Sequence, residues 1–159
     1  MTNNDILRRL RYTFNLNDDS MTKICTSEGM EIKREEVTAW LKKDEDEAHR
    51  PISDVDLSIF LDGFIALKRG KQEGANSADH GPLTNNAVFR KLKIALNLKD
   101  DDIIKMLELG GMKVSKHEIS AFFRKPGQKQ YRHCKDQMLR NFIRGMQLTY
   151  KPGDKKDEE

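Results

Sequence analysis

Apolar residues recur at three- and four-residue spacings along most of the chain, which is the pattern of amphipathic helices. The longest of these stripes contains Leu57, Phe60, Leu61, Phe64 and Ile65. Similar stripes lie near residues 6–14, 21–25, 37–41, 88–96, 103–107, 119–123 and 139–146. No segment alternates apolar and polar residues with a period of two. The pattern therefore predicts an all-α fold without strands.

The order of the stripes repeats within the chain. When the sequence is shifted by 82 positions, residues 2–67 match residues 84–149 without a gap, with 20 identities in 66 positions. We therefore expect a tandem duplication of a four-helix unit, with repeat 1 at residues 1–68 and repeat 2 at 84–150. Because one copy of this size buries only a thin core, we expect the two copies to pack against each other with pseudo-two-fold symmetry.

The segments outside the repeats are polar. Residues 69–83 contain three glycines, a proline and few apolar side chains, which is typical of a flexible linker. Residues 151–159 have no apolar face to bury, so we expect a disordered tail.

Several residues mark the expected ends and contacts of the helices. The asparagine pairs at 3–4 and 85–86 suit N-caps. Ser115 with Glu118 has the spacing of a capping box, and Pro126 with the glycine after it is expected to end that helix. Gly63 and Gly145 lie inside the fourth helix of each copy. There they predict a close approach of two helices, because a mid-helix glycine is otherwise unfavourable.

Charge distinguishes the two copies. The 159 residues carry a net charge of only +3, but residues 1–68 sum to −4 and residues 84–150 to +8. The contrast is sharpest after the third helix of each copy, where Asp-Glu-Asp-Glu at 44–47 in repeat 1 corresponds to a basic segment at 124–135 in repeat 2. A basic segment of this kind favours an anionic partner.

The second and third helices of repeat 2 have the order of a helix-turn-helix pair, within residues 104–124. The apolar spacing of the second half resembles phage-repressor-type DNA-binding helices, whereas the turn is about two residues longer than that family uses. One face of the later helix combines cationic and small polar side chains, and the loop after it adds further polar ones. The candidate contact residues for nucleic acid or another anionic partner are His117, Ser120, Arg124, Lys125, Gln128, Lys129, Tyr131 and Arg132.

Two functional hypotheses follow from these charges. In the first, repeat 2 binds DNA or RNA. In the second, the chain is a protein–protein adaptor, or associates with itself, by docking an acidic repeat 1 on a basic repeat 2. A solvated charged loop without a partner is the third interpretation of the same residues.

The sequence contains no motif for catalysis, metal binding or a cofactor. No glycine-rich phosphate loop, HExxH or GxSxG pattern occurs, and Cys25 and Cys134 are too far apart for a metal or redox motif. We therefore expect a non-enzymatic protein without a metal or cofactor. The chain has no long apolar run and no signal-peptide pattern, so we also expect a cytoplasmic protein without membrane contact.

Several runs resemble the YehS-like family of short bacterial proteins, a tandemly duplicated domain of unknown function. The resemblance extends from about residue 3 to residue 149. It implies a bacterial, cytoplasmic, duplicated protein without a known cofactor, and it names no substrate or catalytic residue. The runs that carry it are at residues 4–12, 39–43, 60–63, 98–102 and 122–127.

Overall fold

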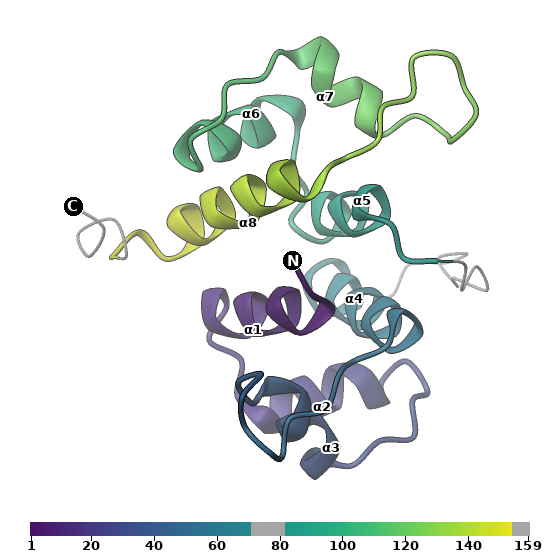
Figure 1. The fold of residues 1–159 in the computed structure, drawn as a ribbon, viewed down its shortest axis with the longest axis vertical. Coiled ribbons are helices and arrows are strands. Elements are labelled where there is room, and N and C mark those ends of the chain that lie inside the picture. The colour runs from purple at the N-terminus through teal and green to yellow at the C-terminus, as the bar shows by residue number, and fades with distance from the viewer. Residues whose placement is uncertain (71–81, 154–159) are drawn as a thin grey trace. The chain divides into compact units, whose positions relative to one another are not determined.

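A computed structural model describes residues 1–70 and 82–153 of the chain, and these residues form eight helices and no strand (Figure 1). The all-α prediction is confirmed. Repeat 1 contains α1 (Asn3–Thr13), α2 (Asp18–Thr26), α3 (Arg34–Leu41) and α4 (Asp54–Arg69). Repeat 2 contains α5 (Asn85–Ala95), α6 (Asp100–Leu109), α7 (Lys116–Phe122) and α8 (Asp136–Tyr150). Each helix of repeat 2 starts 82 positions after its counterpart in repeat 1, as the duplication requires.

The chain divides into two compact units, Met1–Leu83 and Thr84–Glu159, and each unit contains one repeat. Helix α4 ends at Arg69, so it includes the first residue of the predicted linker. Two parts of the chain lie outside the described residues: residues 71–81 of the predicted linker and residues 154–159 of the predicted disordered tail. The expected pseudo-two-fold packing of the two copies stays a prediction.

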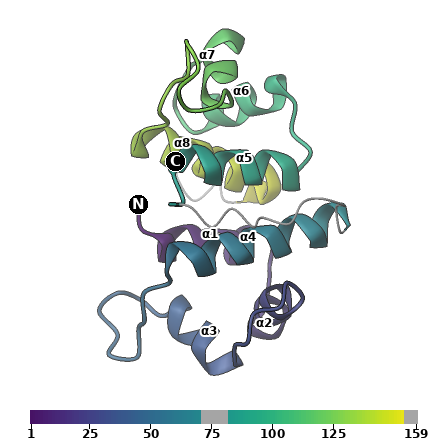
Figure 2. The ribbon, with the colours of Figure 1, turned by 90° about the vertical axis from the view of Figure 1, so that its right-hand side faces the viewer.

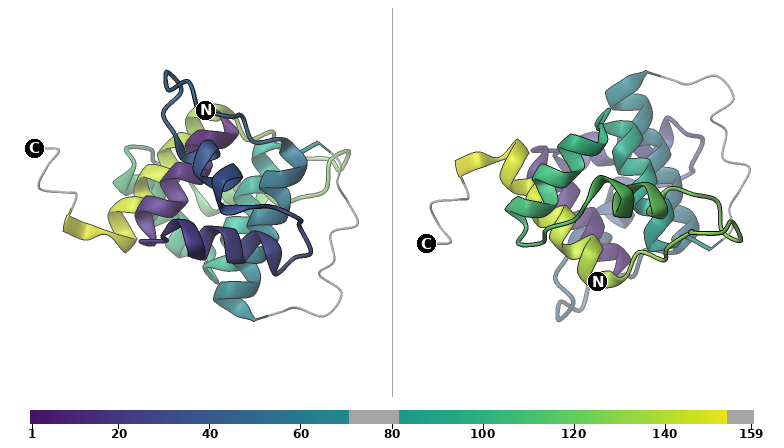
Figure 3. Two further views of the ribbon diagram at one scale, coloured as in Figure 1. Left: turned by 90° about the horizontal axis from the view of Figure 1, so that it is seen from below. Right: turned by 90° about the horizontal axis from the view of Figure 1, so that it is seen from above.

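The same helix pairs pack together in both repeats. In repeat 1, α1 lies beside α4, and α2 and α3 lie together on one side of this pair (Figure 2; Figure 3, left). In repeat 2, α5 lies beside α8 and α6 contacts both α7 and α8 (Figure 3, right). Each repeat has its own apolar core. The largest fully buried side chains are Phe60, Phe64, Phe89, Phe142, Leu7, Leu10, Met21, Leu57, Leu61, Leu92, Ile103 and Leu107.

The glycines inside α4 and α8 lie at close helix–helix contacts, as their positions predict. A Cβ atom added at Gly63 would overlap the backbone carbonyl oxygen of Ile24 in α2. A Cβ added at Gly145 would overlap the carbonyl oxygen of Met106 in α6. The backbones of these helix pairs therefore meet directly, with no room for a side chain between them.

The starts of α1 and α5 differ from the prediction by one residue. Thr2 and Thr84 are the N-caps, and their hydroxyl oxygens accept hydrogen bonds of 3.1 Å from the N–H groups of Asp5 and Ala87. The asparagines that follow are the first residues of each helix, and their side chains bind elsewhere. The capping box at α7 is confirmed, because Ser115 and Glu118 exchange two hydrogen bonds of 3.1 Å.

Candidate nucleic-acid interface

A buried asparagine at the start of α5 holds the loop that carries most of the predicted contact residues. The Asn86 side chain donates to the carbonyl oxygens of Phe122, at 3.0 Å, and of Arg132, at 2.9 Å. Its own oxygen accepts from the N–H of Cys134 at 2.8 Å. One side chain thus joins the end of α7 to the far end of the following loop. We call this arrangement, with the two bonds described next, the asparagine clamp.

The clamp also explains where α7 ends. The Arg90 guanidinium donates to the carbonyl oxygen of Phe123 at 2.7 Å, and the N–H of Arg132 donates to that of Ala121 at 3.1 Å. Together with Asn86, these donors satisfy carbonyls that a further helical turn would otherwise use. The expectation that Pro126 ends this helix is therefore wrong, because α7 ends at Phe122, before the proline is reached.

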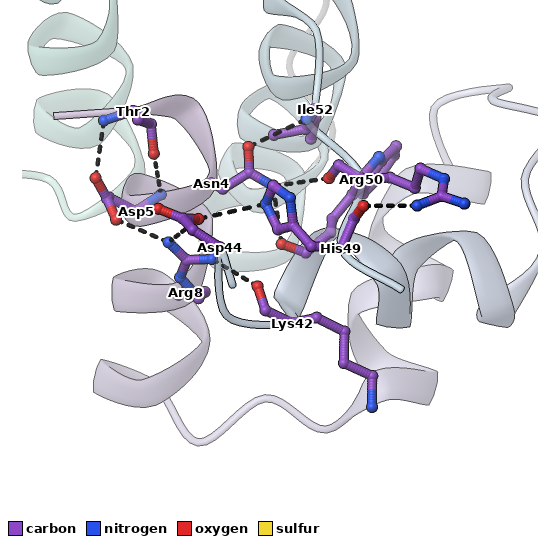
Figure 4. Close-up of polar contacts among 10 residues, drawn as sticks. Thr2, Asn4, Asp5, Arg8, Lys42, Asp44, His49, Arg50 and Ile52 are labelled. Carbon is purple, nitrogen blue, oxygen red and sulfur yellow. Dashed lines mark hydrogen bonds and ion pairs between the residues drawn. The ribbon is translucent and has the colours of Figure 1, made fainter. Parts of the chain in front are cut away.

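Repeat 1 contains the same clamp, which there holds a loop of different sequence (Figure 4). Asn4 donates to the carbonyl oxygens of Trp40 and Arg50, at 2.9 and 3.0 Å, and accepts from the N–H of Ile52 at 3.2 Å. Arg8 donates to the carbonyl oxygen of Lys42, the residue directly after α3, at 2.7 Å. The identities of Asn4 with Asn86 and of Arg8 with Arg90 therefore have a structural cause, since these side chains build the clamp.

The two clamped loops share backbone hydrogen bonds and differ in charge. In repeat 2, the N–H of Gln128 donates to Lys125 and that of Tyr131 to Gln128. The equivalent bonds in repeat 1 join Asp46 to Lys43 and His49 to Asp46. The scaffold therefore does not require either charge, and the side chains of these loops can vary without loss of the clamp.

The predicted contact face does not lie on one helix. His117 and Ser120 lie on α7, but Arg124 and Lys125 lie beyond its end, in the loop that extends away from the helices of its repeat in Figure 1. His117 is exposed, whereas the Ser120 hydroxyl donates to the carbonyl oxygen of Lys116 at 3.2 Å, within its own helix. The face that the sequence predicts is therefore divided between a short helix and a loop.

Three cations of the loop remain available to an external anion. Arg124, Lys125 and Lys129 are exposed, and within the described parts of the chain none of them makes an ion pair. Gln128 is exposed, but its side-chain oxygen accepts from the N–H of Lys125 at 3.0 Å. Its amide N–H groups stay available to a ligand.

The last two predicted residues lie near the end of the loop. Tyr131 is half-buried. Arg132 is exposed, and its guanidinium lies 3.9 Å from the Glu118 carboxylate on α7. The structure thus brings Arg132, from the far end of the loop, beside Glu118 on α7.

The acidic loop of repeat 1 is partly neutralised by its own repeat. Asp44 lies 3.2 Å from the Arg8 guanidinium and 3.4 Å from the His49 imidazole (Figure 4). Asp46 accepts from the N–H of Ala48 at 2.8 Å. Two of its four carboxylates are therefore engaged locally, in contrast to the three loop cations of repeat 2.

The cysteines contribute no reactive group. Burial raises the pKa of both Cys25 and Cys134 to about 12, so the thiols stay protonated near neutral pH. Within residues 1–70 and 82–153, no three His, Cys, Asp or Glu side chains are placed to hold a metal ion. Among the same residues, no helix has the length and apolar character that crossing a membrane requires.

Acid is expected to weaken repeat 2 through two carboxylates that support the clamp region. The 2.7 Å bond from Asn85 lowers the pKa of Asp136, and the N–H of Ser115 lowers that of Glu118. Both groups therefore stabilise the fold above their ordinary values of 3.8 and 4.5, and this contribution is lost as the pH falls through the lowered values. Urea midpoints measured from about pH 6 down to about pH 3 should decrease most steeply below 4.5.

A matched variant separates Glu118 from the other acids. Glu118→Gln keeps an acceptor for the Ser115 N–H but cannot titrate, so its midpoint should fall less steeply over the same pH range. A profile identical to that of the unchanged protein would show that Glu118 makes no such contribution.

Sequence reasoning missed two groups of residues. It treated Asn86 as a cap, although its identity with Asn4 at the matching position indicated a shared role. It also left Lys113, His133 and Lys135 out of the candidate contact residues, although all three line one hollow beside α7. Their proximity depends on the packing of α7 near the start of α8, which helical spacing alone does not reveal.

Comparison with known proteins identifies relatives but no activity. The family model described as "Protein of unknown function (DUF1456)" matches residues 3–70 and again residues 85–151, one match in each repeat. The chain is also 40% identical over 147 residues to "Uncharacterized protein YehS" of Escherichia coli (strain K12), which covers 92% of this chain and 94% of that protein. No solved structure matches the chain. The chain is therefore a member of the DUF1456 family, with one copy of the family domain in each of its two repeats.

Proposed function

We propose that this protein is a non-enzymatic nucleic-acid-binding module whose contact surface is the clamped loop of repeat 2. The observation that carries the proposal is the opposite charge of two loops held by the same clamp. Both loops begin with two cations, but residues 44–47 of repeat 1 are all acidic, whereas the matching residues 126–129 of repeat 2 contain no acid and add Lys129. The fold itself accepts either set. A charge that the fold does not need is available for a ligand.

The contacts favour phosphate binding over the reading of base sequence. Arg124, Lys125 and Lys129 can each reach a phosphate, whereas Ser120 and Gln128 use polar atoms within the protein. Helix α7 ends at Phe122, so it presents little surface to a groove. We therefore expect weak selectivity among duplex sequences and strong dependence on salt.

The test is a salt titration of binding to short labelled duplex DNA and single-stranded RNA. The unchanged protein should bind with a micromolar or weaker dissociation constant, and affinity should fall with a log–log slope near −0.9 for each duplex phosphate neutralised. The variant Arg124→Gln, Lys125→Gln, Lys129→Gln should lose binding, or show a slope shallower by about two to three.

A variant of equal charge provides the control. Lys99→Gln, Lys105→Gln, Arg140→Gln removes three exposed cations of repeat 2 that lie outside the loop. It should bind nearly as well as the unchanged protein if the loop is the contact surface. Equal losses of affinity in both variants would show that net charge alone causes the binding. Absence of binding by the unchanged protein at low salt would refute the proposal.

The alternative function is self-association or docking on another protein through complementary loops. It predicts that the loop variant changes the mass of the protein in solution, measured by analytical ultracentrifugation, while nucleic-acid binding is negligible throughout. The ion pair of Asp44 with Arg8 disfavours this alternative, because it reduces the charge that repeat 1 offers.

A further inference from the structure

A hollow of about 260 Å³ lies beside α7 in repeat 2, on the side of the Glu118 carboxylate. Val114, Phe122 and Met138 contribute apolar surface to its wall, from the segment before α7, from its last residue and from the first turn of α8. Phe122 is almost fully buried, whereas Val114 and Met138 are half-buried. The hollow thus presents an apolar wall that the fold leaves partly open to solvent.

Basic side chains surround this wall. Lys113, Arg132, His133 and Lys135 all line the hollow and are all exposed. An apolar surface beside several cations is suited to a ligand that has a flat apolar part and negative charge next to it. A nucleotide with its base unstacked has both properties.

Glu118 adds an acceptor to the hollow. Its Oε1 accepts from the N–H of Ser115 at 3.1 Å, while Oε2 lies 3.9 Å from the Arg132 guanidinium, too far for a hydrogen bond. The hydrogen bond from Ser115 lowers the pKa of Glu118, so the group is ionised near neutral pH. A carboxylate oxygen beside the apolar wall can accept a hydrogen bond from an exocyclic amino group of a base.

Repeat 1 does not repeat the charges of this hollow. The positions of Lys113, His133 and Lys135 are taken there by Glu31, Pro51 and Ser53. The glutamate and the arginine at the other two positions are kept, as Glu36 and Arg50. Lys113, His133 and Lys135 of the rim are therefore specific to repeat 2, as is Lys129 of its clamped loop.

We propose that this hollow receives one unstacked, amino-bearing base of a single-stranded nucleic acid. The base lies against Val114 and Met138, its amino group donates to Glu118 Oε2, and the phosphates next to it contact Lys113 and Lys135. This inference rests on the proposed function, because the clamped loop would bind the same strand. It predicts that cytosine is preferred to thymine, which has a carbonyl oxygen in place of the amino group.

The preference is measured with oligo(dC), oligo(dT) and a mixed-sequence duplex of equal length, at one salt concentration and neutral pH. The unchanged protein should bind oligo(dC) about five- to tenfold more tightly than oligo(dT). In Glu118→Gln, the capping box is kept but an amide N–H₂ faces the base, so the preference should disappear or reverse toward oligo(dT). Urea unfolding of each variant checks that the fold is intact.

The rim is tested separately from the acceptor. The double variant Lys113→Gln, Lys135→Ser should weaken the binding of both oligonucleotides several-fold. The ratio of their two dissociation constants should stay unchanged. The control Lys99→Gln with Lys105→Ser removes the same charge elsewhere on repeat 2 and should have a smaller effect.

The outcomes distinguish this inference from the proposed function. Equal binding of oligo(dC) and oligo(dT), a Glu118→Gln variant with an unchanged ratio, or tighter binding of the duplex would each overturn the inference about the hollow. If the loop variant still abolished binding in those cases, the proposed function would stand. Failure to bind any of the three ligands would remove both.

Discussion

Replacing Asn86 with alanine is expected to destabilise repeat 2 by about 3–5 kcal/mol, which is enough to unfold many single domains. The substitution removes the bonds to the carbonyl oxygens of Phe122 and Arg132 and leaves the N–H of Cys134 without its partner. Each buried polar group that loses its partner costs about 1–3 kcal/mol. The Arg132 carbonyl is only partly buried, so water can offset part of its loss.

The free energy of unfolding in urea, followed by circular dichroism, measures this cost. Asn85→Ala is the matched control, because the neighbouring asparagine also bonds to the loop, through the carbonyl oxygen of Cys134, but is only half-buried. We expect it to cost about 1 kcal/mol. An Asn86 variant no less stable than the Asn85 variant would show that the clamp does not hold the loop.

Gly145→Ala is expected to destabilise repeat 2 by about 2 kcal/mol, although alanine favours a helix by about 1 kcal/mol over glycine. The added Cβ would overlap the backbone of Met106, which cannot move aside as the end of a flexible side chain would. Helices α6 and α8 would have to separate, and the packing beside this contact would be lost. The sign of the effect therefore distinguishes steric contact from intrinsic helix propensity.

Thermal and urea unfolding of the variant measure the effect. Gly153→Ala is the control, since no atom lies within 4 Å of a Cβ built at that glycine, and its stability should be nearly unchanged. Stabilisation by Gly145→Ala would contradict the close contact of α6 with α8.

The helices and the duplication could be predicted because their signals are local. Apolar spacing locates each helix, and the match of residues 2–67 with 84–149 predicts the second copy from the first. The capping box at Ser115 is a pattern within four adjacent residues, so its position in the sequence indicates the start of α7. The glycines of α4 and α8 also indicated their contact, because glycine inside a helix needs a reason.

The end of α7 could not be predicted from its own residues. It depends on Asn86, which is 36 positions away, and on Arg90, whose guanidinium takes the next carbonyl. The loop cations were found because they are adjacent in sequence. Lys113 was not, because only the packing of α7 near the start of α8 places it on the hollow that Lys135 also lines.

The clamp also has a consequence for how such a protein can diversify. Asn86 and Arg90 bond mainly to backbone groups of this region. The side chains between Arg124 and Tyr131 are therefore expected to contribute little to the stability of the fold. Substitutions there are expected to change the charge of the loop, with little effect on whether the copy folds. A gene duplication of this unit therefore yields two loops whose side chains can evolve separately, and the same positions are suitable for grafting a binding segment by design.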